Sequence, residues 1–205
     1  MKLIFIILIT SNILLSDIFK LNKNEIKYIK TLHNKKQILK RFSNFSKFFK
    51  EVKKYEELKQ LYRTNNFVNR LIAKHDGNTD TWLNPKEFLI KGRGDCEDYA
   101  ITKYFALEKL GFDINKLYLT VVQVKGFPNA YHLVVMFMNK NNIPMILDNL
   151  SWKVLPLNKR KTLKFIFAFD ENHSYIFKKN KLVIENKIRR GEVKLFKSML
   201  NKIRE

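Results

Sequence analysis

Apolar residues recur at the helical period through the first third of the sequence. Between residues 22 and 74 they stand about every three or four positions, and lysines occupy most of the positions between them. This pattern is typical of helices that bury one face and expose the other. It predicts one helical segment over residues 26–32, a longer one over 38–55 and another, after a break or bend, over 58–71.

The next predicted helix is marked at both ends. The turn residues His75-Asp76-Gly77-Asn78 and the glycine-rich stretch 91–94 precede it. Asp95 is a favourable N-cap, acidic residues occupy the first turn and Gly111 provides a stop, so we predict a helix from about residue 95 to residue 110. Its apolar positions are expected to face a core: Ala100, Ile101, Tyr104, Phe105 and Leu107.

Strand signals dominate the rest of the chain, because Val, Ile, Leu and Phe gather there in short runs. The runs are residues 117–124, 130–138, 143–147 and 165–169, and we expect a hairpin over 175–184 and a basic terminal helix over 192–204. Helices first, followed by one helix that leads into a mainly antiparallel sheet, predict an α+β fold. A chain of 205 residues that is 45% hydrophobic is long enough for one domain with a sizeable core.

The amino terminus has the pattern of an export signal. Met1-Lys2 is followed by an apolar run over residues 3–15, interrupted only by Thr10, Ser11 and Asn12. A basic start before a short apolar run predicts a secretory signal peptide over residues 1–16, with an uncleaved anchor or a buried helix as alternatives. We therefore expect residues 17–205 to form an exported domain.

Charge and cysteine content narrow the range of functions. The formal net charge is +21, and the chain has one cysteine. Such a positive surplus is typical of a protein with a polyanionic partner, but an exported chain without a recognised nucleic-acid-binding motif is not expected to bind nucleic acid. The basic run Lys159-Arg160-Lys161 is expected to form a solvated surface. The single cysteine excludes an internal disulfide and a zinc site made of several thiolates.

Cys96 lies in the first turn of the predicted helix, in the run Gly94-Asp95-Cys96-Glu97-Asp98. A thiol at a helix amino terminus has its pKa lowered by the helix dipole, which is the position of an activated nucleophile. The alternative is a small buried residue that fills a helix–sheet interface. The residues that follow in the sequence favour the first interpretation.

His132 lies in one strand-like run and Asp148 directly follows the next. The residues between the runs, Asn139-Lys140-Asn141-Asn142, have the composition of a hairpin loop. If the antiparallel pairing is centred near residue 140, His132 stands opposite Asp148 on the same face of the sheet. An aspartate there orients an imidazole that takes the thiol proton, so Cys96, His132 and Asp148 form a candidate triad. A register slip of one residue would turn the two side chains to opposite faces.

These motifs resemble those of the bacterial transglutaminase-like cysteine proteinases. The resemblance covers roughly residues 50–177, and its blocks are residues 79–87, 94–104, 131–135 and 147–150. It implies a papain/transglutaminase-like α+β fold, with the nucleophile helix packed on the sheet. The best-understood branch, the LapG type, consists of periplasmic proteinases that cleave the amino-terminal region of a large repeat-containing surface adhesin and so promote biofilm detachment.

The resemblance also implies roles for single residues. Cys96 would be the nucleophile, His132 the general base and then the acid, and Asp148 the orienting carboxylate. The oxyanion would bind the backbone N–H of Cys96, and Trp82 is a candidate second donor. Trp82 is also a candidate exposed contact for an inner-membrane cyclic-di-GMP receptor, which in this family sequesters the enzyme.

Calcium is the cofactor that the resemblance implies. Asp95 and Glu97 match the ligand positions of the family, and Asp98 is adjacent. Three carboxylates beside a thiol oppose thiolate formation, and Ca²⁺ would neutralise them. The alternative is that these acids only cap the helix.

Two other functions remain open at this point. One is a non-catalytic basic protein that binds acidic polymers or a membrane surface, and the positive net charge favours this function. The other is a related acyl-transfer enzyme, either an amidase or a true transglutaminase, which would use the same three residues.

Overall fold

The computed structural model describes residues 18–74, 81–127, 131–179, 181–185 and 190–204. The predicted signal peptide over residues 1–16 and the turn at 75–78 lie outside these residues. Within the described ranges, no helix combines the length and the apolar character that crossing a membrane requires.

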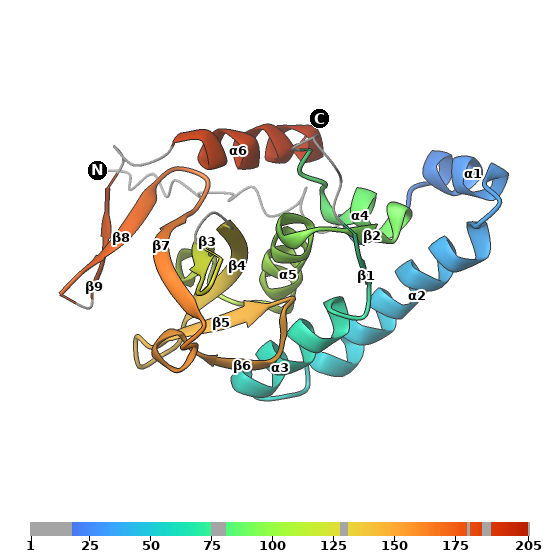
Figure 1. Cartoon of the computed structure of the whole chain (residues 1–205). Coiled ribbons are helices and arrows are strands. Elements are labelled where there is room, and N and C mark those ends of the chain that lie inside the picture. The colour runs from blue at the N-terminus through green and yellow to red at the C-terminus, as the bar shows by residue number, and fades with distance from the viewer. Residues whose placement is uncertain (1–17, 75–80, 128–130, 180, 186–189, 205) are drawn as a thin grey trace, which may run out of the picture.

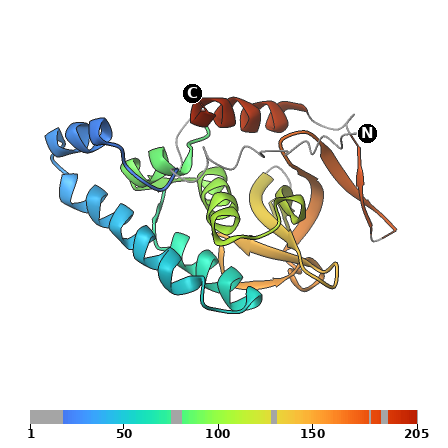
Figure 2. The same ribbon diagram turned by 180° about the vertical axis from the view of Figure 1, so that it is seen from behind.

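Three helices form the amino-terminal part, as the hydrophobic period predicts. They are α1 (Lys23–Thr31), α2 (Lys35–Val52) and α3 (Glu57–Val68). The buried positions of α2 recur at the helical spacing, and its lysines face solvent: Ile38, Phe42, Phe45, Phe48 and Val52 are buried. Figures 1 and 2 show these helices on the side of the molecule opposite the sheet.

A short helix and a two-stranded parallel sheet lead to the cysteine. They are β1 (Ile72–Ala73), α4 (Pro85–Lys91) and β2 (Arg93–Gly94), of which β1 pairs with β2. Asn84 and Glu87 form a capping box around the first turn of α4, and Gly92 ends this helix with a φ of +73°, which favours glycine. The sequence analysis predicted only a glycine-rich turn here.

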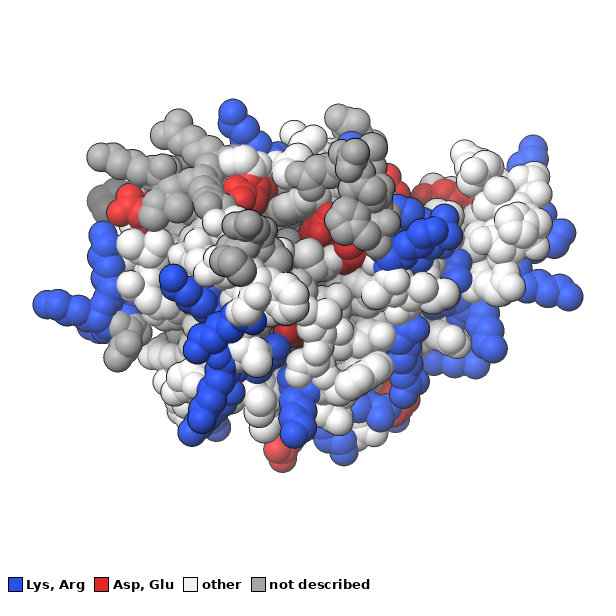
Figure 3. Space-filling view, in the orientation of Figure 1, with Lys and Arg blue, Asp and Glu red and all other residues white. Residues whose placement is uncertain are grey.

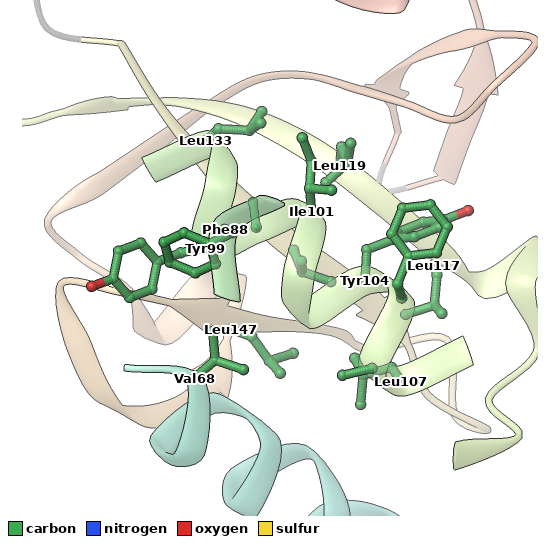
Figure 4. Close-up of a cluster of buried hydrophobic side chains, with 14 of the residues drawn as sticks. Val68, Phe88, Tyr99, Ile101, Tyr104, Leu107, Leu117, Leu119, Leu133 and Leu147 are labelled. Atoms are coloured by element: carbon green, nitrogen blue, oxygen red, sulfur yellow. The ribbon is translucent and has the colours of Figure 1, made fainter. Parts of the chain in front are cut away.

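Helix α5 (Cys96–Leu110) begins and ends where its capping residues predict. Asp95 is the N-cap, and Gly111 is the C-cap in the left-handed conformation, with a φ of +97°. The helix is buried on nearly all sides, because the sheet covers one face and α3 and α4 cover others (Figure 4). All five apolar positions that were expected to face the core are buried.

The main sheet has seven strands in the order β6-β5-β4-β3-β7-β8-β9, and every pair of neighbours is antiparallel. The strands are β3 (Leu117–Val124), β4 (Tyr131–Met138), β5 (Pro144–Asp148), β6 (Ser151–Pro156), β7 (Leu163–Phe169), β8 (Ser174–Lys178) and β9 (Lys181–Ile184). The predicted strands and hairpin are confirmed. β6 was missed, because this edge strand exposes Trp152 and Lys153 and lacks a clear apolar alternation.

The last described element is α6 (Arg190–Arg204), which agrees with the predicted terminal helix. Its buried residues Phe196, Met199 and Leu200 pack on the central core, and the rings of Phe196 and Tyr104 lie 5.7 Å apart. Figure 1 shows α6 along the top of the molecule, above α5 and the sheet. Helices around one central helix on a mainly antiparallel sheet confirm the predicted α+β fold.

Candidate active site

The amino terminus of α5 is fixed by the buried carboxylate of Asp98. Its Oδ1 accepts a hydrogen bond from the Leu83 N–H at 3.0 Å, and its Oδ2 accepts one from the Asp95 N–H at 3.3 Å. A Cβ atom on Gly94 would lie 2.1 Å from Asp98 Oδ2, so this close approach requires glycine. Asp98 therefore positions the residue that follows the N-cap, which is Cys96.

Cys96 opens into a cavity of about 360 Å³ between α5, the start of β4 and the first turn of α6. The cavity brings together the cysteine and the histidine that the sequence analysis singled out. Its walls are formed by Trp82, Cys96, Glu97, Tyr131, His132 and Glu192, among others. The Cys96 thiol also forms a hydrogen bond with the backbone of Leu133, the neighbour of His132.

His132 and Asp148 are in direct contact, since His132 Nε2 and Asp148 Oδ1 lie 2.7 Å apart. The register that leads to this contact differs from the predicted one. A pairing centred on residue 140 would place Val135 opposite Met145, whereas the structure pairs Val135 with Leu147. The prediction of directly opposed residues was thus wrong by two positions. Because this displacement is even, His132 and Asp148 still share a face of the sheet.

The second carboxylate oxygen of Asp148 is held by Arg160. Arg160 Nη2 lies 2.5 Å from Asp148 Oδ2, and both side chains are buried. Burial alone would raise the pKa of Asp148, but the hydrogen bonds and charge of His132, the Leu150 N–H and Arg160 outweigh it and hold this pKa well below its usual range. Asp148 is therefore a carboxylate at neutral pH. The prediction of a solvated basic run was wrong for Arg160, because this residue enters the interior to pair with a buried charge.

Asn65 on α3 and Asn69, the C-cap residue of this helix, hold the backbone around Asp148, and the sequence analysis missed both. Asn65 Oδ1 accepts from the Asp148 N–H at 2.9 Å, and its Nδ2 donates to the Ser151 carbonyl at 2.7 Å. Asn69 Nδ2 donates to the Asp148 carbonyl at 3.0 Å. The signal in the sequence is the spacing of four residues between Asn65 and Asn69. This spacing places both amides on the side of α3 that also buries Leu61 and Val68.

The environment of the thiol favours its protonated form. Burial and the nearby charge of Glu97 raise the pKa of Cys96 to about 12, and the thiol donates to Glu97 Oε2 at 3.3 Å. Burial and a hydrogen bond with Asp95 in turn raise the pKa of Glu97 to about 8. These effects oppose the helix dipole, as the sequence analysis expected of carboxylates beside the thiol.

Trp82 lies in the wall of the cysteine cavity and is only 7% exposed. Its ring lies 6.2 Å from that of Phe169. The expectation of an exposed tryptophan is therefore wrong, because this side chain is packed against the core beside the cavity. Its position in the wall agrees with a contact to a molecule that enters the site.

The comparisons with known proteins now decide the family. A family model described as bacterial transglutaminase-like cysteine proteinase BTLCP matches residues 20–179. The chain belongs to this family. The match confirms the resemblance found in the motifs, and the protein is therefore a cysteine peptidase.

Solved structures of Legionella pneumophila LapG are similar to this proteinase over most of both chains. EGTA-treated LapG has a TM-score of 0.71 and 27% identity, and the match covers 87% of this chain and 95% of that one. Calcium-bound LapG has a TM-score of 0.69 and 30% identity, with 86% and 98% covered. A comparison with curated protein sequences gave no match.

The acidic residues beside Cys96 differ in their fitness to bind a cation. The carboxyl groups of Asp95 and Glu97 are close enough to share a hydrogen bond, and burial together with this hydrogen bond raises the pKa of Glu97 to about 8. A divalent cation would displace the proton of Glu97. Both oxygens of Asp98 already accept backbone hydrogen bonds. Within the described ranges, no group of three His, Cys, Asp or Glu side chains is placed to hold a metal ion. Asp95 and Glu97 thus fit calcium with the help of backbone or water oxygens, whereas Asp98 has a structural role in this proteinase.

Lys103 is a further buried charge that the sequence analysis missed. It lies on α5 and is 1% exposed. Burial and the positive charge of Arg160 lower the pKa of Lys103, Asp148 raises it in part, and the result is a pKa of about 7. Asp148 is therefore the counter-charge for two buried cationic groups, Arg160 and Lys103.

The depressed pKa of Lys103 predicts a pH dependence of stability. Between about pH 7 and pH 10.5 the unfolded state binds this proton and the folded state does not, so the free energy of unfolding gains a contribution that rises with pH. Urea titrations across this range should show that the wild-type protein gains stability, by up to a few kcal/mol, relative to Lys103→Met. Parallel curves for the two proteins would contradict the assigned pKa.

Proposed function

We propose that this protein is a calcium-dependent periplasmic cysteine endopeptidase that cleaves the amino-terminal region of a large surface adhesin. The observation that carries the proposal is the His132–Asp148 hydrogen bond, whose imidazole lines the cavity into which the only cysteine of the sequence opens. A paired imidazole and carboxylate beside a thiol are the parts that acyl transfer requires.

In the proposed mechanism each residue of the triad has one role. His132 Nε2 faces Asp148, so Nδ1 is the ring nitrogen that accepts the proton of the Cys96 thiol. The thiolate attacks the peptide carbonyl carbon, and the backbone N–H of Cys96 at the start of α5 donates to the oxyanion. His132 then protonates the leaving amine and the C–N bond breaks, which leaves a thioester. Water, deprotonated by the same imidazole, hydrolyses the thioester and restores the thiol.

Asp148 fixes the orientation of the imidazole and stabilises its protonated form. Arg160 and the backbone contacts from α3 keep this carboxylate ionised and in place. In this proposal the sheet carries the general base, α5 carries the nucleophile, and α3 holds the backbone of the orienting carboxylate in place.

Asp95 and Glu97 would hold the calcium ion. When bound, the cation would supply positive charge beside the thiol and so remove the obstacle that Glu97 presents to thiolate formation. The calcium-bound and EGTA-treated structures of Legionella pneumophila LapG support this part of the proposal.

Removal of calcium is expected to stop substrate cleavage. In EGTA the thiol keeps its raised pKa, so the proteolytic rate should fall to background, and Ca²⁺ but not Mg²⁺ should restore it. Calcium should also raise the melting temperature of the wild-type protein, because it binds the folded state, and should do so less in Asp95→Asn and Glu97→Gln. Undiminished cleavage by chelator-treated protein would exclude calcium as the cofactor.

The adhesin substrate, the periplasmic location and sequestration by an inner-membrane cyclic-di-GMP receptor are proposed on the family resemblance and the amino-terminal sequence pattern. The adhesin substrate is tested by incubating the purified protein with amino-terminal adhesin fragments and identifying the products by mass spectrometry. Two peptides whose masses sum to substrate plus water support the endopeptidase. Crosslinking or amine incorporation without scission would favour a transglutaminase, and binding without any product would favour the non-catalytic protein.

A further inference from the structure

A second hollow lies between α3 and β6 and shares no lining residue with the cysteine cavity. Its volume is about 330 Å³. Figures 1 and 2 both show α3 and β6 side by side at the lower edge of the molecule. The side chains around it come from α3 and the turn after it, with one neighbour each from α2 and β6: Tyr62, Arg63, Asn66, Arg70, Phe48 and Trp152.

Aromatic side chains form much of the lining of the hollow. Phe48 and Phe67 stack with their ring centroids 4.2 Å apart at an angle of 13° and form its apolar base. Trp152 is 57% exposed and Tyr62 is 48% exposed at its rim. Large aromatic side chains that surround a hollow on the surface are typical of recognition sites, where they provide rigid apolar contact area.

Positive charge surrounds these aromatic residues. Arg63 and Arg70 both line the hollow. Arg63 forms an exposed ion pair with Glu51, and Arg70 has no carboxylate partner within the described part of the chain. Lys and Arg are abundant and Asp and Glu are few on the lower part of the face in Figure 3, where Figure 1 places α3 and β6. A guanidinium group binds carboxylates through paired hydrogen bonds, so the complementary ligand is acidic.

Asn66 adds a polar contact of a different kind. Its Oδ1 is buried and accepts no hydrogen bond from the residues that the structure describes. A buried acceptor without a donor costs free energy, so the Asn66 amide in the lining of the hollow has hydrogen-bonding capacity that the described residues leave unused. Carboxylates that pair with the arginines and an apolar side chain that packs on the aromatic rings together describe a segment of polypeptide.

The hollow is also linked to the catalytic carboxylate. Asn65 on α3 and Asn69 at its C-cap hold the backbone of Asp148 and Ser151, and Trp152 follows Ser151 directly. A segment bound in the hollow therefore contacts both elements that hold Asp148 in place. This arrangement favours the substrate itself as the source of the segment over an unrelated partner.

We propose that the hollow is an exosite that binds an acidic segment of the substrate polypeptide, with a large apolar side chain placed between Trp152 and Phe67. The choice of substrate rests on the proposed endopeptidase function, whereas the recognition of an acidic segment does not. The segment would lie outside the scissile bond, which binds in the cysteine cavity.

Tryptophan fluorescence tests the binding directly and without catalysis. The sequence has two tryptophans, of which Trp82 is buried and Trp152 is exposed, so acrylamide quenches mainly Trp152. A short Asp- and Glu-rich peptide with a central Phe should protect Trp152 from acrylamide and shift its emission to shorter wavelength. The same peptide with Asn and Gln in place of the acids should not.

Matched variants distinguish binding in the hollow from a general attraction between the basic protein and an acidic peptide. Arg70→Ala should weaken binding of the acidic peptide about tenfold, because it removes a charge-assisted hydrogen bond. Lys153→Ala removes the same charge from the exposed residue beside Trp152 but outside the hollow, and should leave binding nearly unchanged. No protection of Trp152, or equal effects of the two substitutions, would overturn the exosite.

Cleavage assays then test whether the polypeptide that binds in the hollow is a segment of the substrate. With a long acidic substrate, Arg70→Ala should raise KM and leave kcat unchanged. An unchanged KM beside weakened peptide binding would assign the hollow to another acidic protein and reject the substrate. If no protein substrate is cleaved at all, the endopeptidase function fails, while the fluorescence result still decides whether the hollow binds acidic polypeptide.

Discussion

Replacing Cys96 by alanine is expected to lower the rate of substrate cleavage by at least about 10³-fold. The chain has no second thiol, and the cavity that contains Cys96 also contains the imidazole that is held by Asp148. The variant removes the nucleophile while the capping contacts of Asp98 remain, so the fold should persist. Product formation by mass spectrometry and the urea unfolding curve measure the two effects separately.

Two further variants make this result specific. Cys96→Ser keeps the size of the side chain but provides a poor nucleophile, so it should be nearly as inactive as Cys96→Ala. His132→Ala should retain a thiol that iodoacetamide alkylates but should not cleave substrate. Substantial cleavage by Cys96→Ala would mean that the reaction does not pass through a thioester, and both the proposed mechanism and the role of the cavity would have to be abandoned.

The sequence was most informative where local chemistry determines structure. Asp95 and Gly111 mark the ends of α5 because N-caps and left-handed C-caps depend on adjacent residues alone. Likewise, the positions of His132 and Asp148 on one sheet face follow from the twofold period of strands. That inference survived a wrong register because the error was an even number of residues.

The residues that hold the catalytic side chains in place could not be predicted, because they act through contacts between segments that are distant in the sequence. Arg160 stands between two lysines, and nothing in that run distinguishes it from a solvated charge; only its approach to Asp148 does. Lys103 occupies a helix position that a lysine normally exposes, but the sheet and the amino-terminal helices cover α5 on nearly all sides. Asn65 and Asn69 act through backbone groups about 80 residues further along the chain.

These supporting residues form one electrostatic unit. A single carboxylate, Asp148, faces Arg160 and His132 directly and is the counter-charge of Lys103. Arg160 Nη1 is buried without an acceptor in the described part of the chain, so its burial is only partly compensated. Asp148 therefore has two functions, one in catalysis and one in the stability of the interior, and a substitution there affects both.

Replacing Asp148 by asparagine is expected to reduce both activity and stability. The amide keeps the shape of the side chain but removes its charge, which leaves the buried Arg160 guanidinium without a counter-charge and lowers the pKa of Lys103 further. Breaking a buried ion pair in this way costs about 3–5 kcal/mol, to be measured as the free energy of unfolding in urea. Loss of the carboxylate that orients His132 should lower kcat by about 10²- to 10⁴-fold under conditions where the variant is folded.

A second substitution separates the two functions. Asp148→Asn combined with Arg160→Met removes the uncompensated guanidinium, so the double variant should regain part of the lost stability and none of the lost activity. Arg160→Met alone should be destabilised, because Asp148 then loses the partner that satisfies its second oxygen. If the double variant recovers activity together with stability, Asp148 acts only through the fold. If Asp148→Asn is as stable as the wild type, the buried cationic groups have another counter-charge, and the assignment of that role to Asp148 is wrong.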